Sequence, residues 1–450
     1  MSSATASADV ETEHGSLERL GSERLAAGLA ALLALVLVAG AAEVVLDAAE
    51  GFSPMVPAQP AFDSWLAGIG TRLGYDQFLP TLLISFAAYG ALAALAHRRP
   101  GLLPARWAVA FVAALQLILF AGPVLLATDL FTNVAYAHEA VNGINPYIHG
   151  PAALPTFAGY HFVSPDWVRW PSPYGVVFTL VTLPAGLVSL DGGIWILKLE
   201  GLIESAAVLW LTWRCARVRG FDPVLAIIVV GANPLYTLYT LGGSHNDLLM
   251  MAFMLAGVAL LVSSPASAGR EAGGAATIVA GALVKATLGV MLPFLIASKR
   301  RLAPIIGAVA ALATGLAVGY ALWGSSAVNI FEGLRREGAL VSSYSFASQL
   351  SHLLGKPGVY PIDHTLLTIA LVLALAYLLW RTWRGYDWIA ASGWAMLAIA
   401  VTTTWLMPWY TVWPLPLAVI TRDRRLLTAT LVIQTIWVIH QTSPLYGPVP

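Results

Sequence analysis

The sequence predicts an all-α, polytopic membrane protein, and its composition and its long apolar runs carry this prediction. Hydrophobic residues make up 58% of the 450 residues and charged residues only 11%, against roughly 25% charged residues in an average soluble domain. Apolar runs of about 18 residues or more recur along the chain, which is the length that crosses about 30 Å of hydrocarbon. The formal net charge is zero, so nothing indicates a nucleic-acid partner. The single cysteine, Cys215, excludes an intramolecular disulfide and a cysteine-based zinc site.

Clusters of basic residues set the expected topology, because short loops rich in Arg and Lys stay in the cytoplasm. Such clusters occur at residues 97–106, 214–219, 299–301, 381–384 and 422–425. The spans that place every cluster inside are 24–44, 78–96, 107–127, 193–213, 223–241, 246–263, 303–322, 366–381, 387–405, 408–421 and 425–441.

Two further apolar segments cannot each be a simple crossing. A single crossing by residues 174–190 would place the 214–219 cluster outside, so we expect an interfacial or re-entrant helix there. A single crossing by residues 274–298 would invert every later loop, so we expect two half-spans that meet near Lys285 at the outer surface. The pattern gives about thirteen transmembrane helices, with the N-terminus inside and the C-terminus outside.

A single transmembrane domain, residues 23–450, is expected to follow a short tail. Residues 1–22 are polar and acidic and lack a cleavable-signal pattern, so they predict a disordered cytoplasmic tail. Large loops near 45–77, 128–192 and 324–365 fall on the external face. Long loops rich in Trp, Tyr, His and Pro tend to be functional, so the external face is the expected location of a site.

Two acids in the 128–192 loop are candidates for a catalytic base. Asp129 stands where the third span meets this loop, and Glu139 lies ten residues further on. An acid at a helix end is commonly a solvated boundary residue. A carboxylate beside the bilayer is also suited to general-base catalysis, because partial desolvation raises its pKa toward the working range. We take Asp129 as the first candidate and Glu139 as the second.

His245, Asn246 and Asp247 follow one another at the outer end of an apolar span. One interpretation is helix capping, since Asn or Asp before an apolar helix is a good N-cap. The other is that a His–Asp pair orients a hydroxyl-rich ligand or a phosphate. Metal binding is disfavoured because no further ligand stands at metal-binding spacing.

Three cations are candidates for a phosphate site. Lys285 lies inside an apolar segment, where a charge is costly and therefore indicates function, although its stem could also snorkel to the interface. Arg335 and Arg336 break the positive-inside pattern and would form a second cationic arm. Their alternative role is in a solvated helix, paired with Glu332 and Glu337.

An aromatic segment, residues 404–417, surrounds another outer turn with three Trp, one Tyr and three Pro. Such residues mostly form the aromatic belt of a membrane protein. They are also suited to line a groove for a lipid chain or to stack on a sugar ring.

Five segments of the chain, in order, resemble those of a known family: "TDLFTNVAYAHEAVNGINPY", "SPYG", "SHNDLLM", "VKATLGVMLPF" and "MPWYTVWPLPL". In these segments the chain resembles GT-C superfamily glycosyltransferases, and above all the polyprenyl-phosphate-mannose-dependent α-mannosyltransferases. These include glycosyltransferase family 87 and the α-1,6-mannosyltransferases of lipomannan synthesis. The resemblance spans most of residues 107–421.

The resemblance implies a GT-C-like bundle with interfacial helices in its external loops, and an enzyme that transfers mannose with inversion. It implies that Asp129 is the base and that no metal or other cofactor is needed. The donor would be a polyprenyl-phosphate sugar, and the acceptor a glycolipid or glycan on the external face of the plasma membrane. The candidate substrate-binding residues in these segments are His245, Asn246, Asp247, Asn145, Tyr147, Tyr174, Trp409 and Tyr410.

Other function classes stay open at this stage. A transporter or flippase of lipid-linked sugars would use the same charges to gate a pathway, but polarity would then extend through the membrane midplane. A transferase of another polyprenyl-phosphate sugar, such as arabinose, would share the same residues. A scaffold subunit of a cell-envelope complex would not need Asp129, His245 and Lys285 together.

Overall fold

The computed structural model describes residues 3–50 and 75–441, and within these ranges every secondary-structure element is a helix. The all-α prediction is therefore confirmed. The α-helices are α1 (Ser3–Ala49), α3 (Tyr75–Arg98), α4 (Ala105–Ala121), α5 (Asp129–Val141), α6 (Val176–Gly186), α7 (Leu190–Arg219), α8 (Pro223–Gly231), α9 (Asp247–Val262), α10 (Ala268–Ala282), α11 (Met291–Lys299), α12 (Leu302–Trp323), α13 (Ile330–Glu337), α14 (Phe346–Leu353), α15 (Pro361–Trp383), α16 (Trp388–Thr402), α17 (Leu415–Ala418) and α18 (Arg424–Gln441).

Shorter helical turns connect these helices. Six of them are 3₁₀ or π turns: η1 (Pro151–Ala153), η2 (Tyr160–Phe162), η3 (Leu235–Leu241), η4 (Ala286–Val290), η5 (Gly324–Val328) and η6 (Pro408–Val412). Of these, η3 is a π-helix. Three of the turns, η3, η4 and η6, contain or lie close in sequence to residues of the candidate site.

Several helices are long and apolar enough to cross a membrane. Among the described residues these are Gly21–Ala49, Phe78–Arg98, Leu302–Val328 and Pro361–Trp383. Helices α8 and η3 supply a fifth span if they form one broken helix, bent by 54°. Other expected spans are shorter apolar helices, among them α4, α9 and α16. The number of about thirteen crossings therefore stays a prediction.

The N-terminal tail differs from the expectation. Helix α1 begins at Ser3, so residues 3–22 are helical rather than irregular. Their sequence contains no Pro and several strong helix formers (Ala, Glu, Leu and Arg), which allows the apolar helix to extend backwards. Most of the loop expected at 45–77 lies outside the described residues.

The two apolar segments that were not expected to cross the membrane singly, residues 174–190 and 274–298, form a short helix and a broken helix. Helix α6, within residues 174–190, has 11 residues and is therefore about 16 Å long, about half of what a crossing needs. In the other segment, α10 ends at Ala282 and the chain turns through η4 into α11, so the helix breaks at Lys285 as the sequence predicts. Helix α10 packs against both α9 and α12.

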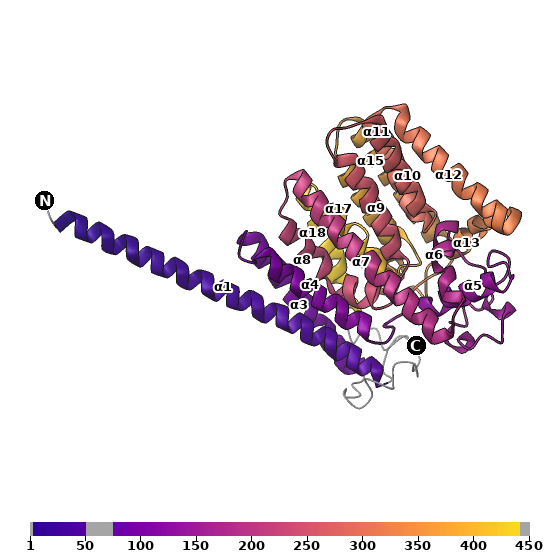
Figure 1. Cartoon of the computed structure of the whole chain (residues 1–450), viewed down its shortest axis with the longest axis horizontal. Helices are drawn as coiled ribbons and strands as arrows, with labels where there is room; N and C mark the ends of the chain where they lie inside the picture. The colour runs from indigo at the N-terminus through magenta and orange to yellow at the C-terminus, as the bar shows by residue number, and fades with distance from the viewer. Residues whose placement is uncertain (1–2, 51–74, 442–450) are drawn as a thin grey trace.

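The 128–192 loop is folded. Buried side chains of α5, η2 and α7 form a small hydrophobic core of their own, in which Phe131 stacks on Phe162 with ring centroids 4.9 Å apart. In Figure 1, α5, α6 and α13 lie together at the right of the molecule. This group covers one end of the main bundle, and we call that end the acidic end after Asp129, Asp247 and Glu337, which lie there.

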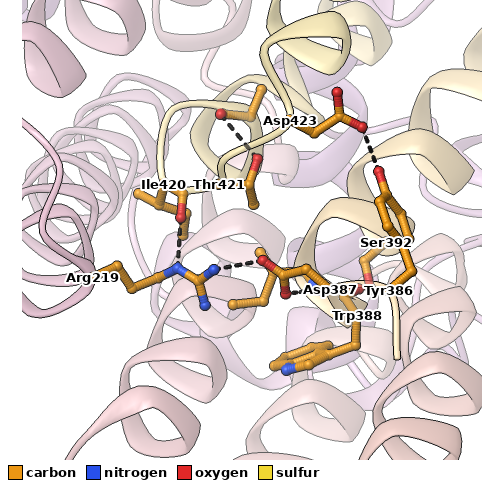
Figure 2. Close-up of polar contacts among 10 residues, drawn as sticks. Arg219, Tyr386, Asp387, Trp388, Ser392, Ile420, Thr421 and Asp423 are labelled. Carbon is orange, nitrogen blue, oxygen red and sulfur yellow. Dashed lines mark hydrogen bonds and ion pairs between the residues drawn. The ribbon is translucent and has the colours of Figure 1, made fainter. Parts of the chain in front are cut away.

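Basic loops gather at the opposite end of the bundle, which we call the basic end. Arg219, at the end of α7, pairs with Asp387 at the start of α16 and donates a hydrogen bond to the Ile420 carbonyl (Figure 2). Tyr386 donates a hydrogen bond to Asp423 in the same cluster. Helix α9 runs from Asp247 at the acidic end to Val262 beside this cluster, and its 16 residues span about 24 Å.

Candidate active site

Asp129 is the first residue of α5, and the chain that leads to it is held on both sides. Lys198 of α7 donates hydrogen bonds to the carbonyls of Leu119 (3.1 Å) and Pro123 (3.4 Å). The N–H of Leu125 then bonds to the carbonyl of Gly242, at 2.9 Å. These contacts fix the segment 119–125, so the position of Asp129 is set by α7 and η3 together.

His245 lies beside Asp129 and is almost completely buried. Its Nδ1 is 3.2 Å from Oδ2 of Asp129, within ion-pair distance although without hydrogen-bond alignment. The imidazole stacks on the indole of Trp409, with ring centroids 3.6 Å apart. The stacking and the burial hold the His245 ring next to Asp129.

Strained backbone occurs on both sides of this pair. Leu126, three residues before Asp129, has a φ of 56°, and Ser244, directly before His245, has a φ of 48°. Neither residue is a glycine, so each left-handed conformation costs on the order of 1–3 kcal/mol. Strain of this kind persists where surrounding contacts impose it, and it is frequent at functional sites.

Asp247 and Lys285 form a second, buried pair. The Lys285 ammonium lies 3.0 and 3.1 Å from the two carboxylate oxygens of Asp247, and Trp413 Nε1 donates a hydrogen bond to the same carboxylate. The ammonium also lies 4.4 Å from the ring centroid of Tyr410, a cation–π contact. Lys285 is therefore turned inward and does not snorkel to an interface.

The capping interpretation of the His245–Asp247 segment is wrong. Helix α9 begins at Asp247, but its N-cap residue, Asn246, makes no side-chain capping bond. Asn246 is buried, and its Nδ2 has no hydrogen-bond partner among the described residues. Of the polar side chains of this segment, His245 is thus directed to Asp129 and Asp247 to Lys285.

The helix break at Lys285 is stabilised by the start of α6. The N–H groups of Gly175 and Val177 bond to the carbonyls of Val284 (3.2 Å) and Leu283 (3.1 Å). A Cβ added to Gly175 would lie 2.0 Å from the Leu283 oxygen, so only glycine permits this approach. The contact satisfies backbone groups that the break would otherwise leave unpaired and brings Tyr174 toward Lys285.

One cavity of about 200 Å³ joins these residues. Five of the residues that the sequence singled out line it: Asp129, Lys285, Tyr174, Trp409 and Tyr410. His245 and Asp247 lie behind this wall, each in contact with one of its members. Trp405, from the aromatic segment that the sequence offered as a sugar-stacking surface, also lines it, as does Glu337, which the sequence placed in an ion pair with the neighbouring arginines. Residues that the sequence did not single out line the rest of the cavity, among them Thr132, Tyr136, Asp166 and Trp167.

Two of the carboxylates that line the cavity, Asp129 and Glu337, have pKa values shifted in opposite directions. Burial acts to raise the pKa of Asp129, but the neighbouring His245 and Lys285 outweigh it and hold the pKa below its ordinary value. The sequence predicted a raised pKa for Asp129, and that expectation was wrong because it lacked these neighbours. Burial raises the pKa of Glu337 to about 7, with Lys285 lowering it and Asp129 and Asp247 raising it.

Glu139 is not part of this cavity. It is completely buried within α5, and neither carboxylate oxygen has a hydrogen-bond partner among the described residues. Burial raises its pKa to about 8. Glu139 therefore does not meet the geometric requirement for a base that reaches a ligand in the cavity.

Arg335 and Arg336 do not reach the cavity either. Both bind Glu332 on the solvent side of α13, at 3.3 and 3.2 Å, and both are exposed. Of the two alternatives that the sequence left open, the structure places them in a solvated helix. Glu337 lies five residues after Glu332, which is about 140° further round the helix, so it faces away from these arginines. The expected ion pairing of these arginines is therefore confirmed for Glu332 and wrong for Glu337.

Asn145 and Tyr147 hold neighbouring segments of the fold together. Asn145 Nδ2 donates hydrogen bonds to the Trp323 carbonyl (3.1 Å) and the Ser326 hydroxyl (2.6 Å). The Tyr147 carbonyl accepts a hydrogen bond from Asn329, at 3.1 Å. The "GINPY" segment thus holds η5 and the start of α13, and neither side chain lines the cavity.

No group of three or more His, Cys, Asp or Glu side chains with the geometry of a metal site occurs among residues 3–50 and 75–441 that the structure describes. The charged groups of the cavity are instead arranged as two acid–base pairs, Asp129 with His245 and Asp247 with Lys285. This arrangement suits a ligand that carries both a proton to be removed and a negative charge to be held.

Comparisons with known proteins give a consistent result. Residues 25–300 match the family model "Alpha-(1->6)-mannopyranosyltransferase, N-terminal domain". The chain is 30% identical over 361 residues to Alpha-(1->6)-mannopyranosyltransferase A of Mycobacterium tuberculosis, covering 73% of this chain and 68% of that protein.

Two relatives from Corynebacterium glutamicum match over shorter segments. Alpha-(1->6)-mannopyranosyltransferase A is 28% identical over 184 residues, 40% of this chain and 36% of that protein. Alpha-(1->6)-mannopyranosyltransferase B is 28% identical over 149 residues, 31% of this chain and 25% of that protein. No solved structure matches the chain significantly.

Proposed function

Since the chain belongs to the alpha-(1->6)-mannopyranosyltransferase family, we propose that it transfers mannose from a polyprenyl-phosphate donor to a glycolipid or glycan acceptor. The product would be an α-1,6 linkage, formed in the cavity that Asp129 and Lys285 line. The observation that carries this proposal is the placement of two acid–base pairs on one cavity. The first provides an ionised carboxylate, and the second provides an ammonium.

Asp129 is the proposed base. The acceptor hydroxyl gives its proton to the Asp129 carboxylate while its oxygen forms a bond to the anomeric carbon of mannose. The bond from that carbon to the phosphate oxygen breaks at the same time, and polyprenyl phosphate leaves with the electron pair. One displacement of this kind inverts the anomeric configuration. His245 keeps Asp129 ionised and ready to accept the proton.

Lys285 is the proposed contact for the donor phosphate. An ammonium has three N–H donors, so Lys285 can bind Asp247 and still direct a hydrogen bond to a phosphate oxygen. A preorganised cation next to the leaving group stabilises the negative charge that develops there. Tyr410 and Trp413 pack around the ammonium and limit its movement. Lys285 thus takes the place that a divalent cation would otherwise hold, and no cofactor is part of the proposal.

The proposed location is the plasma membrane, with about thirteen crossings and the acidic end on the external face. Support comes from the gathering of the basic loops at the opposite end, as the positive-inside rule requires. A cysteine in place of Arg335 should react with an impermeant thiol reagent in intact cells. A cysteine in place of Arg384 should react only after permeabilisation, and buried Cys215 gives little background. The reverse pattern would move the site to the cytoplasm.

The direct test is a transfer assay with purified protein. Radiolabelled mannose should move from polyprenyl phosphate to a synthetic α-1,6-linked mannoside, and not from a nucleotide-linked mannose. The rate should be the same with added Mg²⁺ and with EDTA. Movement of the intact donor across proteoliposomes without a product would favour the transporter. Transfer of arabinose in preference to mannose would change the donor sugar but keep the mechanism.

A further inference from the structure

The cavity has two chemically different parts. Among the described residues that line it, Lys285 is the one cation; it lies beside Tyr410, and we call these two and the buried Trp409 the inner part. Besides Asp129, two carboxylates line the cavity, the exposed Asp166 and the half-buried Glu337, and we call these two, with Trp167 and Trp405, the outer part. A phosphate is attracted to the inner part and repelled by the outer part. A neutral ligand rich in hydroxyl groups is suited to the outer part, because carboxylates accept hydrogen bonds from hydroxyls.

Two indoles face this outer part from different loops. Trp167 follows Asp166, and Trp405 comes from the loop after α16; their ring centroids are 6.2 Å apart at an interplanar angle of 63°. Both side chains are half-buried. Indole rings present a large, rigid apolar face at low entropic cost. Aromatic faces combined with a few polar groups that fix orientation are the usual composition of a small-ligand site.

Glu337 is a carboxylate without a fixed partner. Arg335 and Arg336 are both engaged by Glu332, and the Glu337 carboxylate forms no hydrogen bond or ion pair within the described part of the chain. Burial raises the pKa of Glu337, Lys285 lowers it, and Asp129 and Asp247 raise it, so this carboxylate lies within electrostatic range of the reacting groups. A half-buried carboxylate that is left without a donor is ready to accept one from a ligand.

The position of Glu337 is fixed by the "GINPY" segment. Asn145 and Asn329 supply the hydrogen bonds that tie η5 and the start of α13 to residues 145–147. Gly333, in the middle of α13, packs closely on Pro173, where an added Cβ would be 3.2 Å from the Pro173 Cα. Helix α13 has no buried residue, so it lies on the surface and contributes Glu337 to the wall of the cavity.

We propose that the outer part of the cavity, formed by Asp166, Trp167, Trp405 and Glu337, is the subsite for the acceptor sugar, and that Glu337 accepts hydrogen bonds from its hydroxyl groups. This inference rests on the proposed mannosyl transfer and names where the second substrate binds. The acceptor ring stacks on the indoles with its reacting hydroxyl toward Asp129. The donor phosphate remains at Lys285.

The test is a steady-state comparison of Glu337→Gln with the wild-type enzyme, in which donor and acceptor are titrated separately. A lost hydrogen bond to a charged group weakens binding about tenfold to a hundredfold. The acceptor KM should rise by about that factor, whereas the KM for polyprenyl-phosphate mannose should change less than about twofold. Glu337→Asp should recover part of the acceptor affinity.

Glu332→Gln is the matched control, because it removes a carboxylate from the same helix on the solvent side. It should leave both KM values unchanged. Trp405→Ala tests the subsite independently of α13 and should also raise the acceptor KM selectively. Thermal unfolding of each variant in detergent separates these effects from misfolding.

Two failures can be told apart. If the wild-type protein transfers no mannose from polyprenyl phosphate, the proposed function is wrong. If the wild-type protein is active but Glu337→Gln and Trp405→Ala keep the wild-type acceptor KM, the function stands and the subsite is wrong. Equal losses for donor and acceptor would also overturn the subsite, because they indicate a general structural effect.

Discussion

The two ends of the bundle treat buried charge differently. At the basic end each carboxylate has a partner: Asp387 binds Arg219, Glu271 binds Lys299 and Arg301, and Asp423 accepts hydrogen bonds from Tyr386 and Trp394. At the acidic end several buried polar atoms have no hydrogen-bond partner among the described residues. These belong to Thr132, Asn133, His138, Glu139, His245 and Asn246, whereas elsewhere in the described bundle such atoms occur singly, on Gln116, Thr212, Glu271 and Trp437.

An unpaired buried polar group costs roughly 1–3 kcal/mol, so such groups are uncommon in a scaffold. Their larger number at the end of the bundle that holds the cavity indicates that this end is arranged for ligands rather than for stability. Substitutions at the basic end should therefore change the stability of the fold, and substitutions in the cavity should change substrate binding or turnover. Each prediction below tests this division.

The largest of the three ranked effects is expected for Lys285→Ala. Loss of a charged hydrogen bond to the donor phosphate should weaken donor binding by about tenfold to a hundredfold. The variant should also be less stable, because it leaves the Asp247 carboxylate buried without its cation. Donor affinity is measured by direct titration, and stability by thermal unfolding in detergent.

A double variant separates the two consequences. Lys285→Ala combined with Asp247→Asn removes both charges, so it should regain stability without regaining donor affinity. Lys285→Arg should restore part of the affinity. Wild-type donor affinity in Lys285→Ala would show that the lysine serves only to neutralise Asp247.

Glu139→Gln should change stability with pH and leave transfer nearly intact. The pKa of Glu139 is raised to about 8 in the fold from an ordinary value of 4.5. Wild-type stability is therefore fully present below about pH 4.5 and declines as the pH rises toward 8, where the buried carboxyl group ionises. The full shift corresponds to at most about 4–5 kcal/mol.

The measurement is the difference in thermal stability between Glu139→Gln and wild type at pH 5 and at pH 8. The difference should move in favour of the variant at the higher pH. Parallel pH profiles would contradict the raised pKa. A large loss of transfer in this variant, with Asp129→Asn still active, would assign the base to Glu139.

The smallest effect is expected for Arg219→Ala at the basic end. The ion pair with Asp387 is partly exposed, with 22% and 30% of the two side chains accessible, and pairs of this kind contribute about 1 kcal/mol or less. A decrease of roughly 1–3 °C in Tm should accompany unchanged values of kcat and KM. A loss of transfer with normal stability would contradict the assignment of the basic end to fold stability alone.

Residue chemistry predicted much of the site from the sequence. Asp129, His245, Asp247 and Lys285 were identified because ionisable residues beside or inside apolar segments are costly and imply function. The structure brings all four together. What the sequence could not provide is the pairing itself, since Asp247 and Lys285 are 38 residues apart and meet only when α9 packs on α10.

Other features could not be predicted from the sequence, because they depend on tertiary packing and not on a local sequence pattern. Glu337 was expected to pair with the neighbouring arginines, and Trp405 was recognised only as part of an aromatic segment, because the cavity that they share is formed by residues far apart in the sequence. Asn145 was assigned to substrate binding because it stands in a segment that resembles the mannosyltransferase family, but its side chain is used in a contact with Ser326 that no local pattern encodes. The helix break at Lys285 was predictable, because a single crossing there would invert every later basic loop.

The central claim is that the acidic end performs chemistry while the basic end holds the fold, and two matched carboxylates test it in one measurement. Mannosyl transfer and thermal stability are compared for Asp129→Asn and Asp387→Asn, since Asn is nearly isosteric with Asp but cannot take up a proton at neutral pH. General-base catalysis contributes about 10²- to 10⁴-fold, so Asp129→Asn should lose at least about a hundredfold in transfer at nearly wild-type Tm. Asp387→Asn should lower the Tm and keep its transfer rate. Nearly wild-type transfer by Asp129→Asn would contradict the account.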